Sequence, residues 1–503
     1  MCNYAHVSHF VTLKNKSQLE SIIMLFSIAV TLLFLSFFAA VVFTGFLRDI
    51  AKKRNFLIDI PNKSRNFHFR PTPLVGGIAI HASMLFSTLL MLFLVDYKYD
   101  FKIEGLDWLQ SSSSQVSEKG YSQKLSIVND QGEGEESYRI NLTTKDSPLS
   151  DSLSYDVRIG SSEDDQLQIV QIDKKTFQVF MGDGISKSFE LTEDGVIEVG
   201  LLGEPLSQPI NVQNSSAGLY SFSSFTAAFI LVAILLQVFT LIDDAVGISP
   251  AKRLLGQSLA ALAVIILGNI FITSLGLSIL GVSLHIGSWG IPFTVVAVVG
   301  IINAFNMIDG INGLCAGLAL IAMGALQVAS GFNVSNYSLV IAMGSIIGFL
   351  FYNLGFLGTK RRVFLGDNGS TFLGFLVAWT CINYSREELS LIMPVTCLWI
   401  VAIPLLDCLG VIAGRLSKGI LPSDAGRDHI HHKLQAYLGS SFKTLICLCG
   451  MGVFLASIGI IIEKTTQSSE ISLLLFFGVA ACYYGASNYI DAKTSINNTS
   501  TNV

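Results

Sequence analysis

Carboxamide and carboxylate side chains recur at every third residue in one short segment between two apolar runs. Its members are Asn303, Asn306, Asp309 and Asn312, followed by Gly313. Residues three apart lie on one side of a helix, and polar groups at the end of a membrane span are costly unless they bind something. A helix cap needs only one such residue, so a plain polar loop is the weaker alternative. We predict a site for a charged ligand at a membrane surface.

Two further groups of carboxylates follow apolar runs. Asp243 and Asp244 are adjacent, and Asp367 precedes Asn368. Adjacent carboxylates repel each other, so in an apolar setting they need a cation or a proton between them. A carboxylate flanked by a carboxamide suits Mg²⁺ that also contacts phosphate. A solvated helix end for the Asp pair and an N-cap role for Asp367 stay open as alternatives.

Three histidines lie in a basic loop near the end of the chain. They are His429, His431 and His432, and Arg427 and Lys433 flank them. No cysteine accompanies them, so an anionic substrate fits better than zinc. A plain surface loop remains the alternative.

The elements that position these residues are predicted to be membrane helices. The chain has 503 residues, 51% hydrophobic and 14% charged, with a mean hydropathy of +0.57. We therefore predict an all-α polytopic membrane protein with about eleven transmembrane helices of ~20 residues each. The predicted spans are residues 22–47, 74–95, 222–241, 254–271, 289–305, 312–330, 337–356, 369–384, 390–412, 443–462 and 471–489.

The connections between these spans predict their orientation. Basic residues gather in 48–70, 252–253, 360–362 and 415–433, whereas the alternate connections hold almost none. Positively charged loops face the cytoplasm, so the unusual polar residues fall on the cytoplasmic side. We accordingly predict an extracytoplasmic tail (1–21), two spans with a cytoplasmic loop (22–95), an extracytoplasmic insert (96–220), a catalytic membrane body (221–490) and a cytoplasmic tail (491–503).

The predicted insert differs in composition from the rest of the chain. It carries 22 Asp and Glu against 10 Lys and Arg, and it contains no cysteine. Alternating apolar residues and the turn signal Gly182-Asp-Gly184 predict a small β-rich domain with a hairpin. We identify no catalytic constellation in it, and its partner is left open.

Together, the acidic groups would hold a divalent metal, the cations would hold phosphate, and the site would be open to both cytosol and lipid. That combination suits phosphoryl transfer from a soluble nucleotide to a membrane-bound acceptor. A secondary transporter would need ionisable groups near the bilayer midplane, and we find no internal repeat. A membrane scaffold with a decayed site is the other alternative, but the Asp and His sets are intact.

Several motifs in order resemble the polyprenyl-phosphate N-acetylhexosamine-1-phosphate transferases, of glycosyltransferase family 4 type, and in particular their WecA-like bacterial branch. The resemblance covers nearly all of the chain outside 1–21, 96–220 and the last dozen residues. The motifs are Asp59-Ile-Pro61, Arg65, His68, Pro71-Thr-Pro73, Gly76-Gly77, Asp243-Asp244, Asn303–Gly313, Phe364–Ser370 and Arg427–His432.

The resemblance implies transfer of an N-acetylhexosamine 1-phosphate, with GlcNAc as the first choice, from a UDP-sugar to undecaprenyl phosphate, with release of UMP. It implies an enzyme of a bacterial cytoplasmic membrane that initiates a lipid-linked glycan. The metal would be Mg²⁺, with Mn²⁺ as an alternative. Another UDP-N-acetylhexosamine or the muramyl-pentapeptide donor is the runner-up. No nucleic acid is expected as a partner, and a homodimer is left open.

The resemblance also assigns roles to single residues. Asp367 would be the principal metal ligand with help from Asn306. The catalytic group would be Asp243, Asp244 and Asp309, and the Asp pair would handle the lipid phosphate. Substrate would be bound by Asp59, Arg253, Asn303, Asn312, Phe364, Arg427, His429, His431 and His432, with Phe364 and Asn312 on the uracil. Gly426 stands where many relatives have an acidic residue, which leaves sugar selectivity open.

Overall fold

A computed structural model of the chain describes residues 4–60, 70–98, 124–128, 139–145, 154–158, 168–171, 176–180, 186–192, 195–199, 224–279, 282–331, 337–386, 391–421, 426 and 428–500. The chain divides into two compact units. The first comprises residues 1–101 and 224–503, and the second comprises residues 102–223.

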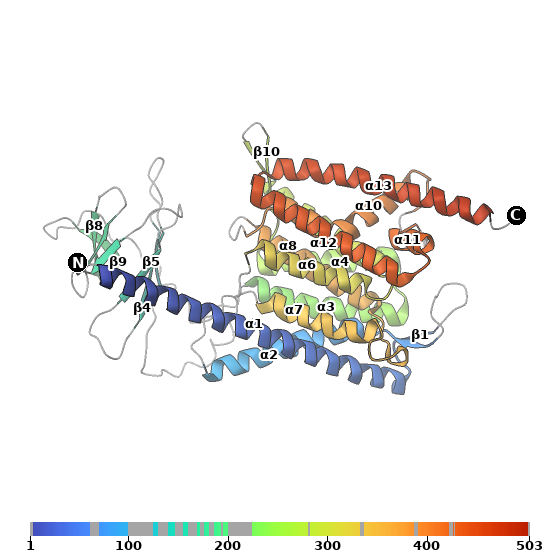
Figure 1. Cartoon of the computed structure of the whole chain (residues 1–503), viewed down its shortest axis with the longest axis horizontal. Helices are drawn as coiled ribbons and strands as arrows, with labels where there is room; N and C mark the ends of the chain where they lie inside the picture. The colour runs from blue at the N-terminus through green and yellow to red at the C-terminus, as the bar shows by residue number, and fades with distance from the viewer. Residues whose placement is uncertain are drawn as a thin grey trace. The chain divides into compact units, whose positions relative to one another are not determined.

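The first unit is a body of helices that run side by side (Figure 1). They are α1 (Tyr4–Arg54), α2 (Gly76–Lys98), α3 (Ser224–Val246), α4 (Pro250–Gly268), α5 (Gly290–Ile308), α6 (Leu314–Ala329), α7 (Tyr337–Asn353), α8 (Gly366–Ser385), α9 (Pro394–Ile400), α10 (Ala402–Leu416), α11 (Ile430–Leu438), α12 (Ser441–Thr466) and α13 (Ser469–Ser500). Short 3₁₀ helices η1 (Gly287–Trp289) and η2 (Thr359–Arg361) join them.

A helix lies at each predicted span, and α9 and α10 share the ninth. Over the described residues, five helical segments are long and apolar enough to cross a membrane, and the bent pair α9–α10 is a sixth candidate. The chain is therefore mostly helical, with several candidate membrane spans, as predicted. The count of eleven spans is not shown by these segments and stays a prediction. Helix α1 also begins well before residue 22, within the segment predicted as a tail.

Short antiparallel strands complete both units. In the first unit, β1 (Ile58–Asp59) pairs with β2 (Thr72–Pro73), and β10 (Ser274–Ile279) pairs with β11 (Val282–His285). In the second unit, the orders are β3-β4-β5 and β6-β7-β8-β9. These strands are β3 (Lys124–Val128), β4 (Arg139–Lys145), β5 (Ser154–Arg158), β6 (Gln168–Gln171), β7 (Thr176–Phe180), β8 (Ser186–Thr192) and β9 (Gly195–Val199). The predicted turn at 182–184 lies outside the described residues, and the β-rich fold of the whole insert stays a prediction.

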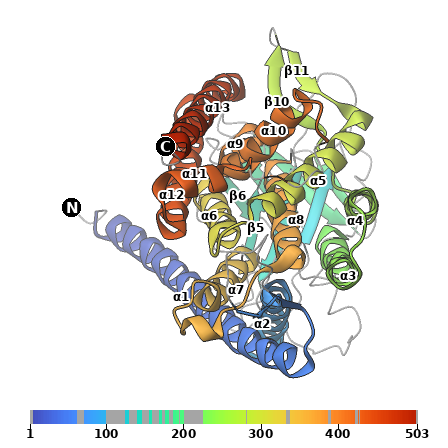
Figure 2. The same cartoon turned by 90° about the vertical axis from the view of Figure 1, so that its right-hand side faces the viewer.

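Helix α8 is the central helix of the first unit. It contacts α2, α3, α5, α6 and α9, and Figure 2 shows it inside the ring of neighbouring helices. Every residue from Asn368 to Ala378 is buried. A helix that is buried all round has no polar face to expose. Asp367 lies in the first turn of α8, so its carboxylate is at the N-terminal end of the central helix.

The predicted ninth span is broken. The segment bends by 82° between α9 and α10, at Val401. Pro404 lies in the first turn of α10 and has no N–H to donate to the Ile400 carbonyl, so the helix cannot run straight through this point. The prediction of one continuous helix over 390–412 was therefore wrong, and α10 carries Asp407 as a helix of its own.

The N-terminal end of α2 packs tightly against the N-terminal end of α8. Phe364 N donates to Pro73 O (2.9 Å), and Gly76 N and Gly77 N donate to Phe364 O and Leu365 O (3.1 and 3.2 Å). A Cβ atom on Gly77 would overlap the backbone of Gly369. The two adjacent glycines therefore allow the backbones to meet one turn away from Asp367.

We expect Gly77→Ala to destabilise the protein by about 1–3 kcal/mol, because backbone atoms on both sides must move apart. Transfer activity is expected to fall with it. Thermal unfolding in detergent measures the effect. Gly324→Ala in α6 is the matched control, since a Cβ there meets nothing within 4 Å. A Gly77→Ala melting temperature equal to that of the control would contradict the close packing.

Candidate active site

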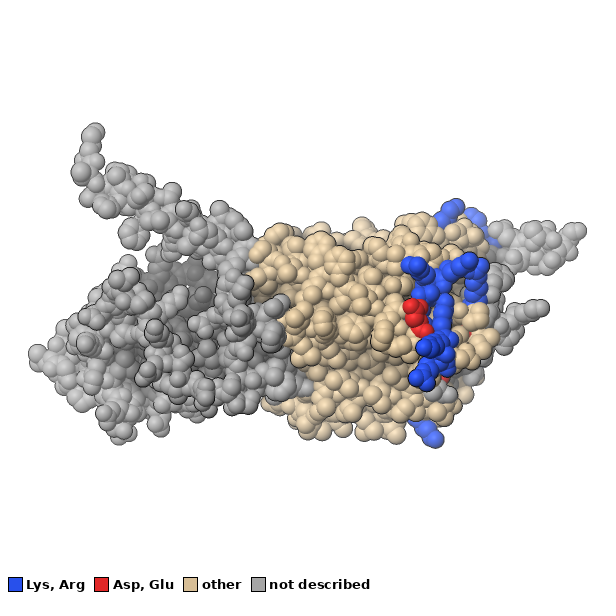
Figure 3. All heavy atoms as spheres, turned by 90° about the horizontal axis from the view of Figure 1, so that it is seen from below, with Lys and Arg blue, Asp and Glu red and all other residues tan. Residues whose placement is uncertain are grey.

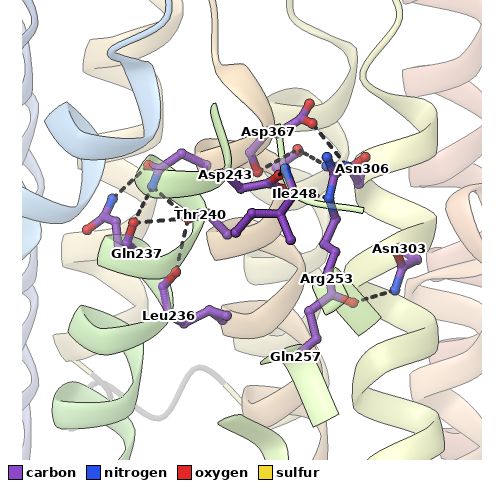
Figure 4. A network of polar contacts seen from close by, with 12 residues as sticks. Leu236, Gln237, Thr240, Asp243, Ile248, Arg253, Gln257, Asn303, Asn306 and Asp367 are labelled. Carbon is purple, nitrogen blue, oxygen red and sulfur yellow. Dashed lines mark hydrogen bonds and ion pairs between the residues drawn. The ribbon is translucent and has the colours of Figure 1, made fainter. Parts of the chain in front are cut away.

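Arg253 bridges two of the predicted carboxylates. Its Nε lies 2.6 Å from Asp243 Oδ2, and its Nη1 donates to Asp367 Oδ2 at 3.2 Å. The Asp243 side chain is 2% exposed, whereas that of Asp367 is 50% exposed. Figure 4 shows the Arg253 side chain reaching from α4 between the ends of α3 and α8. The Arg253 guanidinium of α4 thus joins the buried Asp243 carboxylate of α3 to the accessible Asp367 carboxylate of α8.

The structure addresses both simple alternatives for these acids. Asp367 lies in the first turn of α8, but the N-cap position is Leu365 and no side chain caps this helix end. Asp243 closes the end of α3 by accepting from Ile248 N (2.8 Å). Asp243 therefore has a structural contact as well as the ion pair, and the N-cap explanation does not account for Asp367.

Asp244 and Asp309 add two more carboxyl groups near the same place. Asp244 interacts electrostatically with Asp243 and Asp367, and Asp309 interacts with Asp367. Asp244 Oδ2 is buried and has no hydrogen-bond partner among the described residues. Burial, and next the charge of Asp367, raise the pKa of Asp309 to about 8. Three acidic side chains, those of Asp243, Asp244 and Asp367, thus lie near the single positive charge of Arg253, and Asp309 lies within electrostatic range of Asp367.

The donor set fits a magnesium ion. Carboxylate oxygens are the ligands this hard cation prefers, and an unpartnered buried oxygen on Asp244 is a group that a cation would satisfy. The described residues contain no cluster of three or more His, Cys, Asp or Glu arranged as metal ligands. Mg²⁺ commonly binds through one or two carboxylates plus water and substrate phosphates, so such a cluster is not required. The accessible Asp367 is the first candidate ligand.

Asn303 and Asn306, both in the 303–313 segment, have different surroundings. Asn306 Nδ2 donates to Ser370 Oγ (3.1 Å), and the Asn306 side chain also hydrogen-bonds the Asp367 carboxylate. Asn303 Nδ2 instead donates to Gln257 Oε1 (2.7 Å), one turn along α4 from Arg253. Asn306 therefore lies beside Asp367 of the carboxylate group, whereas the side chain of Asn303 joins α5 to α4.

The same segment changes conformation after Asn306. Helix α5 ends at Ile308, Asp309 is its C-cap, and Gly313 has a left-handed φ of 83°. Asn353, buried at 3% exposure, accepts from Gly313 N (2.6 Å) and donates to Val363 O (2.9 Å). It therefore holds together the two loops that carry Asn312 and Phe364. These are the two residues predicted to bind uracil.

The histidine loop is anchored by Asp407, which is 4% exposed. Its Oδ2 lies 2.9 Å from His429 Nδ1, and its Oδ1 accepts from Ile430 N at 2.7 Å. The rings of His429 and His431 stack with centroids 5.7 Å apart. His431 is in contact with Gly310, where a Cβ would overlap the ring. The loop thus lies directly on the 303–313 segment.

His431 is buried and neither ring nitrogen has a hydrogen-bond partner among the described residues. Burial, and then the neighbouring His432 and His429, lower the pKa of His431 to about 3. The ring is therefore neutral near pH 7, so it offers a hydrogen bond and no positive charge to an anionic substrate. His432 stacks obliquely on His431 at 4.1 Å between centroids.

We expect Asp407→Ala to destabilise the protein by about 2 kcal/mol or more, because two buried donors lose their acceptor. Activity is expected to fall because His429 and α11 are no longer held. Asp491→Ala is the matched control, since Asp491 pairs with Lys433 of the same helix and its side chain is 48% exposed. Exposed ion pairs contribute about 0–1 kcal/mol. Equal melting temperatures for the two variants would contradict the anchoring role.

The remaining predicted residues lie apart or are not described. Asp59 lies on β1 opposite Thr72. Arg427 lies outside the described residues, as do Arg65 and His68. Gly426 lies beside Arg415 and Asp428, which pair at 3.0 Å.

Comparison with known proteins agrees with these motifs. Residues 226–385 match the model of "Glycosyl transferase family 4". The chain is 35% identical to the undecaprenyl-phosphate alpha-N-acetylglucosaminyl 1-phosphate transferase of Escherichia coli O157:H7 over 248 aligned residues. The aligned region covers 48% of this chain and 67% of that protein. The chain belongs to glycosyl transferase family 4. Proteins of the same name from Yersinia pestis and Haemophilus influenzae are 35% and 38% identical, over 68% and 65% of their lengths.

Three polar residues that the sequence did not single out, His81, Gln237 and Thr240, form a network with Asn368. Asn368 Nδ2 donates to Thr240 Oγ1 (2.8 Å) and Gln237 O (2.9 Å), and Gln237 Nε2 donates to Asn368 Oδ1 (3.1 Å). His81 hydrogen-bonds Gln237 and stacks on Phe372. These contacts tie α3 to α8 directly behind Asp243 and Asp367. Each of these polar residues stands alone in a long apolar run, so no regular spacing marks it as part of a site. A polar residue in such a run is nevertheless a candidate site residue, because it is costly there unless it has a partner.

Proposed function

We propose that this chain transfers N-acetylhexosamine 1-phosphate from a UDP-sugar to undecaprenyl phosphate and releases UMP. UDP-GlcNAc is the proposed donor, since the relatives named above are N-acetylglucosaminyl 1-phosphate transferases. The acceptor is likewise taken from their names. The observation that carries the proposal is the bridge from Asp243 through Arg253 to the half-exposed Asp367, beside the unpartnered carboxylate oxygen of Asp244.

In the proposed reaction, an oxygen of the lipid phosphate attacks the β-phosphorus of the UDP-sugar. The bond from this phosphorus to the bridging oxygen breaks, UMP leaves with the electron pair, and a new pyrophosphate links sugar and lipid. The second pKa of a phosphate ester is ~6, so the attacking group is largely dianionic near neutral pH. Direct attack is our preferred route, with Asp243 as base second and a covalent aspartyl-phosphate third. The Arg253–Asp243 ion pair argues for this order, because the Asp243 carboxylate is already engaged by the guanidinium and by Ile248 N.

Each group of side chains has a part in this reaction. Asp367, with Asn306 beside it, is proposed to hold Mg²⁺, or Mn²⁺ in its place. Asp244 and Asp309 are further carboxyl groups nearby, and a bound cation would favour their ionised forms. When bound, the ion neutralises the pyrophosphate and the leaving UMP. Arg253 lies between the carboxylates, where it orients Asp367 and offers its guanidinium edge to phosphate.

The nucleotide and sugar are proposed to lie between the 303–313 segment and the histidine loop. Phe364 and Asn312, which Asn353 holds close, are proposed to bind uracil. His431 lies on Gly310, so the imidazoles of His429, His431 and His432 border the same segment. A hydrogen bond from the neutral imidazole of His431 suits the sugar phosphate.

The basic connections support an active site on the cytoplasmic face of a bacterial cytoplasmic membrane, where nucleotide sugars are available. The product would begin a lipid-linked cell-surface glycan such as an O-antigen, a common antigen or a teichoic acid.

The test is UMP release by the purified full chain in detergent, given undecaprenyl phosphate and Mg²⁺. UDP-GlcNAc, UDP-GalNAc and the UDP-muramyl-pentapeptide are supplied in parallel, each with and without EDTA. We expect release with UDP-GlcNAc that requires the lipid and stops with EDTA. Release with another donor instead would correct the sugar while keeping the reaction. No lipid-dependent release with any donor would overturn the proposal.

A further inference from the structure

A cavity of about 400 Å³ lies apart from the carboxylate group and shares no lining residue with it. Its walls come from the end of α1, the β1–β2 pair and the segment around η2. The lining includes Lys52, Arg70, Thr72, Thr359, Lys360 and Arg362, and none of its described lining residues is acidic. Four cationic side chains thus converge on one hollow, whereas the candidate active site is mainly negative.

The cavity walls are held by contacts outside the charged groups. Lys52 Nζ donates to Lys360 O (3.2 Å), which joins the end of α1 to η2. Leu74 N donates to Leu57 O (2.8 Å), which closes the β1–β2 pair. The Arg362 side chain lies against Gly355, and its Nε is buried without a hydrogen-bond partner among the described residues. Arg362 therefore enters the cavity lining with a guanidinium whose hydrogen-bonding capacity is not fully used within the described residues.

The surroundings indicate where the acceptor comes from. Helix α1 passes as a membrane span over Phe26–Arg54, so Lys52 is at its very end. Large apolar residues flank the lining segments and are exposed: Phe56 (54%), Ile60 (68%) and Phe356 (71%). Cations at the end of a span beside exposed aromatic residues are typical of the headgroup layer of a membrane. Figure 3 shows most Lys and Arg side chains of this face, with a few acidic ones among them, gathered in one band at one end of a surface that is otherwise uncharged.

We propose that this cavity binds the phosphate group of an anionic membrane lipid. Lysine and arginine together suit a phosphate, because the guanidinium groups contact two of its oxygens and the ammonium groups supply charge. The lipid chains would lie along the exposed apolar side chains beside the cavity. The site is separate from the proposed transfer reaction and does not depend on it.

The experiment measures lipid retained by the purified full chain with native mass spectrometry. The chain is offered phosphatidylglycerol, undecaprenyl phosphate or zwitterionic phosphatidylcholine in mixed micelles, and inorganic phosphate is added as a competitor. The variant is Lys360→Gln with Arg362→Gln, and Lys52→Gln is a second variant on the opposite wall. Lys418→Gln with Lys443→Gln is the control, since these cations are exposed elsewhere. Melting temperatures verify folding.

We expect the double variant to retain about tenfold less anionic lipid, and Lys52→Gln to show a smaller loss, while the control matches wild type. Loss with only one of the two anionic lipids would support the proposal and name the source. Equal retention by variants and control would overturn it. Retention of phosphatidylcholine at the same level, or complete displacement by inorganic phosphate at low concentration, would also overturn the lipid assignment. None of these readouts requires turnover, so failure here is distinct from failure of the proposed function.

Discussion

Asp367→Asn is expected to lower the rate of transfer by about 10²–10³-fold while the protein stays folded. The substitution keeps the shape of the side chain and removes the negative charge that would bind the metal. Asp367 is half exposed, and its described contacts are to Arg253 and Asn306, so folding should tolerate the change. Initial rates of UMP release at saturating donor and lipid measure the effect, alongside a melting curve.

Asp49→Asn is the matched control for this variant. Asp49 is an exposed aspartate that pairs with Arg48 at 2.6 Å near the end of α1. Its loss should leave the rate unchanged. A second check is the Mg²⁺ concentration that gives half-maximal rate, which should rise sharply for Asp367→Asn and stay constant for Asp49→Asn. A near-normal rate with a normal Mg²⁺ requirement in Asp367→Asn would remove this residue from the metal role.

Arg253→Gln is expected to have the second-largest effect, a loss of about 10²-fold in rate. Arg253→Lys should recover only part of it, because one ammonium is a point charge and cannot reproduce the bidentate bridge between Asp243 and Asp367. Lys252→Gln, at the exposed neighbouring position, is the control and should behave as wild type.

A loss of stability could mimic this result, because Asp243 would be left buried without its partner. The double variant Asp243→Asn with Arg253→Gln separates the two effects. It removes both charges, so the melting temperature should recover relative to Arg253→Gln while the rate stays low. Recovery of both stability and rate would show that the ion pair is structural only.

Much of the site could be predicted because its residues lie at the ends of apolar runs. The runs before Asp243, Asn303 and Asp367 each end with a polar motif, and helices that span a membrane bring such ends to a shared surface. The structure does bring Asp243, Asp244, Asn306 and Asp367 together around Arg253. Asp309 is within electrostatic range of Asp367 as well.

The missed features depend on tertiary contacts. Asn353 and Gln237 are single polar residues in apolar helices, and the sequence does not say which loop or helix each one contacts. Pro404 indicated a possible helix break before α10. The apolar run around it is long enough for a membrane span, so a single span was predicted instead. The contact of His431 with Gly310 joins segments far apart in the chain, and no spacing rule predicts it. The basic cavity likewise combines two loops that were predicted only to face the cytoplasm.

The central claim is that phosphate moves together with the sugar. It is tested most directly with UDP-GlcNAc labelled with ³²P at the β-phosphate, incubated with the purified chain, undecaprenyl phosphate and Mg²⁺, and extracted with organic solvent. We predict that the label enters the lipid fraction in step with release of unlabelled UMP, and that Asp367→Asn slows both by about 10²–10³-fold. Label that stays in the aqueous phase as UDP, while the sugar alone enters the lipid, would contradict the account.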